Sequence, residues 1–195
     1  MAQIAAERSE PAAAAVANPA PLGLAAFALT TFVLSVVNAG LVSNNGINDV
    51  LGLALFYGGL AQLLAGMWEF RNRNTLGATA FSTYGAFWLA FGFTVWQHLL
   101  VGGPILGWFM LAWGLITLLF FLSALRTDLA LMAVLFFLFL TFVVLGIAEF
   151  SGNSVIRNVG GWLGIVTALL AWYRSWAGIL ESGQGPFRLP VGPMA

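Results

Sequence analysis

The sequence contains no cysteine and only one histidine, His98. Without cysteine the chain can form no disulfide, no thiolate metal site and no thiol nucleophile. A single histidine does not make a metal site by itself, so we expect no bound metal. Charged residues are also scarce, at 7% of the chain, and the seven basic residues balance the seven acidic ones. The charge pattern therefore gives no indication of a nucleic-acid partner.

The sequence also lacks the common motifs of enzymes. It has no phosphate-binding loop, no dinucleotide fingerprint, no HExxH metal motif and no serine nucleophile elbow. The nearest glycine clusters, YGGL and VGGP, lack the flanking residues that such motifs require. We therefore predict that the protein is not an enzyme and uses no cofactor.

What the chain does contain is apolar sequence. Hydrophobic residues make up 61% of its 195 residues, more than a water-soluble domain can bury. A helix needs about 20 apolar residues to cross a bilayer. The runs are too continuously apolar for the alternation of a membrane β-barrel. We therefore predict an all-α integral membrane protein with six transmembrane helices, at about 22–42, 50–70, 75–99, 104–125, 129–147 and 160–180.

The ends of the chain are predicted to lie in the cytoplasm. Residues 1–17 are expected to be a disordered N-terminal tail, 18–182 the transmembrane domain, and 183–195 a cytoplasmic C-terminal tail. If the N-terminus is cytoplasmic, only Arg157 lies outside, which agrees with the positive-inside rule. The arginines then placed inside are Arg8, Arg71, Arg73, Arg126, Arg174 and Arg188.

The first apolar run begins with NPAPLGL at residues 18–24. Asn18 is a good helix N-cap, and Pro19 suits the first helical position because its missing N–H needs no partner there. Two interpretations remain open. The motif fixes the start of a helix at the membrane surface, or it presents free N–H groups and a positive dipole end to an anion.

Polar residues form stripes on the predicted helices. On the first helix, spacings of four, four and three confine such a stripe to a sector of roughly 80°. Isolated hydroxyls and amides often only join membrane helices, but aligned neutral donors favour a path for a small polar solute. The candidate substrate-binding residues are Asn18, Thr31, Ser35, Asn38, Gln62, Thr83 and Trp88, with Phe27 on the same face of the first helix.

Glu69 is one of the two ionisable residues nearest to membrane depth, the other being Glu149. Ionisable groups inside a membrane are functional candidates, so Glu69 is our candidate for proton-linked transport. Because Arg71 and Arg73 follow it, an ion pair at the cytoplasmic surface is an equal alternative. Asp128, beside Arg126, is expected to cap a helix at the interface.

Four stretches of the sequence resemble the acetate uptake transporter family, which includes bacterial acetate/succinate permeases and fungal ammonia/acetate export proteins. NPAPLGL looks like the signature of that family. The other matches are FYGGLAQLLAGMWEF at 56–70, NTLGATAFSTYGAFW at 74–88 and GGWLGI at 160–165. They occur in the order found in the family and cover nearly the whole chain from residue 18 onward.

The resemblance implies a six-helix protomer in a homo-hexameric ring, with a separate solute path through each protomer. It also implies passage of acetate and related short carboxylates such as succinate across the cytoplasmic membrane, by proton-coupled transport or channel-like conduction. The narrow apolar constriction of the family carries over to Phe27, Tyr84 and Leu138. Two alternatives stay open, a membrane sensor or scaffold that binds acids without passing them, and an ammonia conduit.

Overall fold

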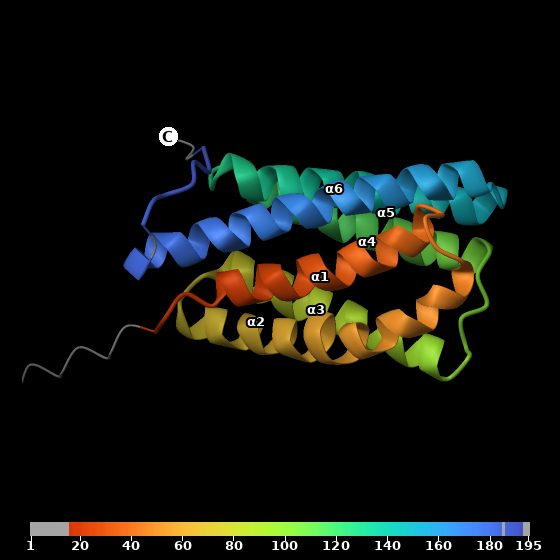
Figure 1. The fold of residues 1–195 in the computed structure, drawn as a ribbon, viewed down its shortest axis with the longest axis horizontal. Helices are drawn as coiled ribbons and strands as arrows, with labels where there is room; N and C mark the ends of the chain where they lie inside the picture. Colours follow the sequence, from red (N-terminus) through yellow and green to blue (C-terminus); the bar gives the residue numbers. More distant parts are fainter. Residues whose placement is uncertain (1–15, 185, 193–195) are drawn as a thin grey trace, which may run out of the picture.

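The computed structural model describes residues 16–184 and 186–192 (Figure 1). Most of the predicted N-terminal tail, residues 1–15, lies outside the described residues. The prediction of an all-helical fold with six helices is confirmed. The elements are α1 (Ala20–Asn38), the 3₁₀ helix η1 (Asn44–Val50), the π-helix η2 (Leu53–Ala61), α2 (Gln62–Arg71), α3 (Thr75–Trp96), α4 (Pro104–Ser123), α5 (Leu129–Ser151), α6 (Ser154–Ile179) and η3 (Leu180–Gln184).

Five helical stretches are long and apolar enough to cross a membrane. α3 is long enough, at 22 residues, but it is less apolar because hydroxyl-bearing residues and glycines recur along it. One side of α3 is buried in the protein and includes Tyr84, Gly85 and Gly92, whereas Thr75 and Thr79 are exposed. The five stretches are Ala20–Asn38, Ile47–Arg71, Pro104–Ser123, Leu129–Ser151 and Ser154–Gly183.

The helices run roughly side by side (Figure 1), and they pack in two groups. α1, η2, α2 and α3 pack together in one group, and α5 packs between α4 and α6 in the other. The groups are joined mainly by α1 against α6. α1 begins and α6 ends at the same end of the bundle (Figure 1).

Several predicted helix bounds differ from those in the structure. α1 begins at Ala20 with Pro19 at the N-cap position, one residue after the predicted N-cap Asn18, whose side-chain oxygen accepts a hydrogen bond from the Ala20 N–H. The second run is not one α-helix but passes through η1 and η2 before α2, because Gly58 and its neighbouring glycine weaken regular helix there. α6 begins at Ser154 rather than residue 160, since its first turns carry polar residues that lower the local hydropathy.

The glycines of the second and third runs pack within the protomer. A Cβ at Gly66 would lie 2.6 Å from the backbone N of Ser82, and one at Gly85 would lie 2.8 Å from the backbone N of Leu63. These glycines therefore let η2, α2 and α3 approach each other closely. They are used inside one chain and give no support to an interface between chains.

The C-terminal segment 186–192 folds back onto the bundle. The Leu129 N–H, at the start of α5, donates to the carbonyl of Gly192 at 2.9 Å. The Tyr173 hydroxyl of α6 donates to the carbonyl of Pro190 at 2.6 Å. The segment is thus fixed at the end of the bundle where α1 and α5 begin.

Candidate functional site

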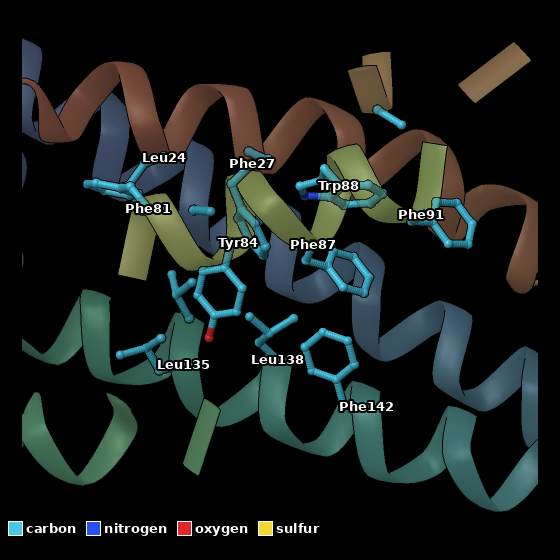
Figure 2. Close-up of a cluster of buried hydrophobic side chains, with 14 of the residues drawn as sticks. Leu24, Phe27, Phe81, Tyr84, Phe87, Trp88, Phe91, Leu135, Leu138 and Phe142 are labelled. Atoms are coloured by element: carbon cyan, nitrogen blue, oxygen red, sulfur yellow. The ribbon is translucent and has the colours of Figure 1, made fainter. Parts of the chain in front are cut away.

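The three predicted constriction residues meet in the middle of the bundle. Phe27 comes from α1, Tyr84 from α3 and Leu138 from α5, and their exposed fractions are 5%, 4% and 4%. The ring centroids of Phe27 and Tyr84 are 5.9 Å apart. Figure 2 shows Tyr84 extending from α3 toward α5, with Leu138 beside it. Three helices therefore each contribute one large apolar side chain to the same point.

A cavity lies on each side of this constriction. The Asn18 cavity, at the end where α1 begins, has a volume of about 330 Å³. The Glu149 cavity, toward the end where α5 stops, has a volume of about 320 Å³. Phe27, Tyr84 and Leu138 line both cavities. They therefore form the partition between two spaces of similar size.

The ring of Tyr84 is held in place by a hydrogen bond. Its hydroxyl donates to the Thr117 hydroxyl oxygen on α4 at 3.0 Å, and the Thr117 hydroxyl in turn donates to the carbonyl of Trp113 at 2.8 Å. The ring of Phe120 packs edge-on against Tyr84 with the centroids 5.7 Å apart. These contacts fix the tyrosine side of the partition, so any opening depends on Phe27 and Leu138.

Three helices begin around the Asn18 cavity, and each has a side chain that accepts a hydrogen bond from its first turn. Asn18, Asn74 and Asp128 all line this cavity. Their side-chain oxygens accept from the N–H groups of Ala20 at 3.0 Å, Gly77 at 3.0 Å and Leu131 at 2.8 Å. The predicted cap at Asp128 is confirmed. Helix starts carry partial positive charge, so three of them around one cavity favour an anion there.

Two further charged or polar groups lie on the Asn18 cavity. Arg174 of α6 lines it and pairs with Asp128, with Nε and Oδ2 2.9 Å apart. Gln62 also lines it, is 1% exposed, and neither its Nε2 nor its Oε1 has a hydrogen-bond partner among the described residues. A buried amide without a partner loses hydrogen-bond energy, so Gln62 is suited to bind a polar solute.

Glu69 is not in the surface ion pair that the sequence offered as an alternative. It is fully buried, and no ion pair joins it to Arg71 or Arg73, both of which the structure describes. Its Oε2 accepts from the amide of Asn72 at 3.1 Å, and its Oε1 has no partner among the described residues. Asn72 lines the Asn18 cavity, whereas Glu69 does not. The ion-pair alternative is therefore wrong.

The polar stripe of the first helix lies on the Glu149 cavity. Thr31, Ser35 and Asn38 line it, as does Trp88 of α3. The Thr31 hydroxyl and the Trp88 ring N–H are buried without hydrogen-bond partners among the described residues. Thr83 lines neither cavity, so we leave it out of the proposed path.

Two charged residues at the mouth of the Glu149 cavity were not predicted as site residues. Glu149 of α5 and Arg157 of α6 line the cavity and form an ion pair, with Oε1 and Nη2 3.0 Å apart. Arg157 was assigned to a loop because the apolar run begins only at residue 160. Glu149 is the single charged residue near the end of α5, and Arg157 is the single charged residue near the start of α6. That isolation among apolar residues is the sequence feature that could have identified them.

The described residues contain no group of three or more histidine, cysteine, aspartate or glutamate side chains that could hold a metal ion. The charged groups on the cavity walls are paired with each other, Asp128 with Arg174 and Glu149 with Arg157. The site therefore offers apolar walls, neutral donors and balanced charges, which suits a small organic molecule with one polar end.

Residues 2–195 match the GPR1/FUN34/yaaH family. Among curated relatives, ammonia transport outward protein 2 of Saccharomyces cerevisiae is 42% identical over 189 residues, covering 89% of this chain and 67% of the relative. The succinate-acetate/proton symporter SatP of Escherichia coli is 37% identical over 186 residues, covering 91% of this chain and 96% of SatP.

A solved structure has the same fold. The structure of the bacterial acetate channel SatP superposes with a TM-score of 0.85 at 36% sequence identity, and the match covers 91% of this chain and 99% of that one. The likeness therefore extends over the six helices that build both cavities.

Proposed function

The chain belongs to the GPR1/FUN34/yaaH family, and on that premise we propose that it carries acetate and related short carboxylates, succinate among them, across the membrane. It is a multi-pass membrane protein of a transporter family, not of an enzyme family. The observation that carries the proposal is the apolar partition of Phe27, Tyr84 and Leu138 between two cavities of similar volume.

The chemistry of the cavities supports acetate as the substrate. Acetate has a methyl group and a carboxylate, so its path needs apolar walls with a few hydrogen-bond donors. The Asn18 cavity supplies three helix starts and the buried amide of Gln62. The Glu149 cavity supplies Thr31, Ser35 and Trp88. A carboxylate therefore finds neutral donors on each side of the constriction.

The constriction supports selectivity for small acids. Shedding water beside apolar walls costs a hydrated ion several kcal/mol when no ligands replace the water. No charged group lines the point where the two cavities meet, because its walls are Phe27, Tyr84 and Leu138. A small acid that is weakly hydrated, or protonated for the moment of passage, crosses at lower cost. A proton link would act through Glu69, whose contact with Asn72 connects it to the Asn18 cavity.

Uptake of radiolabelled acetate into proteoliposomes under an inward proton gradient tests the proposal. We expect uptake well above that of empty liposomes, because the described path needs no further component. Calorimetric binding of acetate without uptake would instead favour a sensor or scaffold. An ammonia-driven change of internal pH without acetate uptake would favour the ammonia conduit named in the yeast relative.

The orientation and assembly belong to the same proposal. We place both termini in the cytoplasm, because six of the seven arginines then lie inside or at the inner surface. We place six protomers in a closed ring, for which the family resemblance is the support.

Native mass spectrometry in mild detergent checks the assembly, and we expect a hexamer as the dominant species. The row Phe56, Leu60, Leu64 and Trp68 is spaced by four residues and is exposed on the protomer, so it is available to lipid or to a neighbouring chain. A spectrum that holds only monomers and dimers would contradict the ring.

A further inference from the structure

An ion pair lies at the mouth of the Glu149 cavity, and neither of its residues belongs to the constriction. Glu149 lies near the end of α5 and Arg157 lies near the start of α6. The side chain of Glu149 is 14% exposed and that of Arg157 is 36% exposed. The guanidinium is therefore the more accessible partner of the pair, at the edge of a cavity that it helps to line.

Glu149 is held from two sides. Its Oε1 pairs with Arg157, and its Oε2 accepts the N–H of Gly103 at 2.9 Å. Gly103 is the N-cap of α4 and has a φ of +70°, a conformation that favours glycine. The carboxylate thus anchors the start of α4, and each of its two oxygens already has a hydrogen-bond donor.

The ion pair with Glu149 does not engage all the hydrogen-bond donors of Arg157. A guanidinium has five N–H donors and commonly grips a carboxylate with two of them. Among the described residues, Arg157 donates one hydrogen bond, from Nη2 to Glu149. Its other donors remain available at the cavity mouth, so a second carboxylate can bind while Glu149 stays in place.

Arg157 differs in charge from the rest of the cavity wall. Among the residues that the structure describes, Arg157 and Glu149 are the only charged ones that line the Glu149 cavity. Past them the wall continues to Asn38, Ser35 and Thr31 on α1, and then to the constriction. One cationic group therefore stands at the outer edge of a series of neutral hydrogen-bonding groups.

We propose that Arg157 is a recognition residue for the substrate carboxylate at the mouth of the Glu149 cavity, with Glu149 holding its guanidinium and moderating its charge. The inference deepens the proposed transport of carboxylates and rests on it. A lone arginine would hold an anion strongly and slow its release, whereas a path needs binding sites that are favourable but weak. Pairing with Glu149 keeps the geometry of the guanidinium and reduces the strength of its attraction.

Two charge-removing variants separate this role from a purely structural one. Arg157→Gln removes the positive charge, and we expect it to raise the half-saturating acetate concentration for uptake about threefold to fivefold, the range of a partly exposed charge interaction. Glu149→Gln removes the competing negative charge but keeps a carbonyl oxygen for Gly103, and we expect it to lower that concentration. If the pair only fastens α5 to α6, both variants impair uptake in the same direction, and the inference is wrong.

The controls use matched chemistry. Arg126→Gln changes an exposed arginine that lines neither cavity, and we expect it to leave acetate uptake unchanged. Arg157→Lys keeps a positive charge and should restore most of the loss. Uptake of acetamide, the uncharged isostere of acetate, should not differ between wild type and Arg157→Gln. An equal change for acetamide would overturn charge recognition.

The inference can fail while the proposed function stands. Wild-type uptake of acetate with no shift of the half-saturating concentration in either charge-removing variant would overturn the inference alone. Absence of wild-type uptake would overturn the proposed function. In that case calorimetric titration of acetate into wild type and Arg157→Gln in detergent still tests the site, since weaker binding by the variant supports it and equal binding refutes it.

Discussion

Phe27→Ala is expected to raise the uptake of three- and four-carbon acids relative to acetate by roughly tenfold, which corresponds to about 1.4 kcal/mol of barrier. The reason is geometric. Phe27 contributes the α1 side of the partition, and its ring packs against Tyr84, which Thr117 holds in position. Removing the ring joins two cavities of about 330 and 320 Å³ by a wider opening. Competition between labelled acetate and unlabelled propionate or butyrate in proteoliposomes measures the change.

The matched control for this experiment is Phe32→Ala. Phe32 lies on the same helix and packs against Trp172 with the centroids 5.3 Å apart, but it lines neither cavity. Both variants lose an aromatic ring from α1, so both are expected to lose some thermal stability. Only Phe27→Ala should change the preference among acids. Equal selectivity in wild type and both variants would show that Phe27 does not limit the path.

The sequence allowed the face of α1 to be predicted well. Phe27, Thr31, Ser35 and Asn38 recur at helical spacing, and all four line the Glu149 cavity. Periodicity succeeds here because α1 is a regular helix whose polar residues are few and aligned. Because charged residues are scarce in the chain, the few hydroxyl-bearing residues within an apolar helix are easy to recognise in the sequence.

The same reasoning could not select the functional side of α3. Hydroxyl-bearing residues and aromatic residues lie on different sides of that helix, and periodicity gives both equal weight. Tyr84 and Trp88 line the cavities, whereas Thr83 does not. Which side faces the path is decided by the packing of α3 against η2 and α2, and the residue pattern of α3 alone does not show which of its sides packs there. The family resemblance, rather than the helical pattern, favoured Tyr84.

Charged residues were the hardest to place from sequence. Glu69 was compatible with a surface ion pair because two arginines follow it, yet it is fully buried beside the start of α3. Arg157 was placed in a loop, although it belongs to α6 and lines a cavity. In both cases the local sequence gives the depth of the residue only approximately, because the ends of membrane helices continue past their apolar runs.

Gly161→Ala is expected to have the largest effect on stability, a loss of about 3 kcal/mol or more, at the upper end for overpacking. A Cβ at Gly161 of α6 would lie 2.5 Å from the Cα of Ala39 and closer still to its backbone N. Both of these are backbone atoms at the end of α1, so no side-chain rotation can relieve the overlap. α1 and α6 form the main joint between the two groups of helices, and the substitution should separate them. Thermal unfolding followed by size-exclusion chromatography in detergent measures the loss.

Gly114→Ala provides the comparison that isolates packing from helix propensity. Gly114 lies inside α4, and a Cβ there would meet the Phe142 Cβ at 3.5 Å, an ordinary contact distance. Alanine is favoured over glycine in a helix interior by up to about 1 kcal/mol, and that gain applies to both sites. The difference between the two variants is therefore the cost of forcing α1 and α6 apart. Similar unfolding temperatures for both would mean that the close approach of Gly161 to Ala39 does not hold the two groups of helices together.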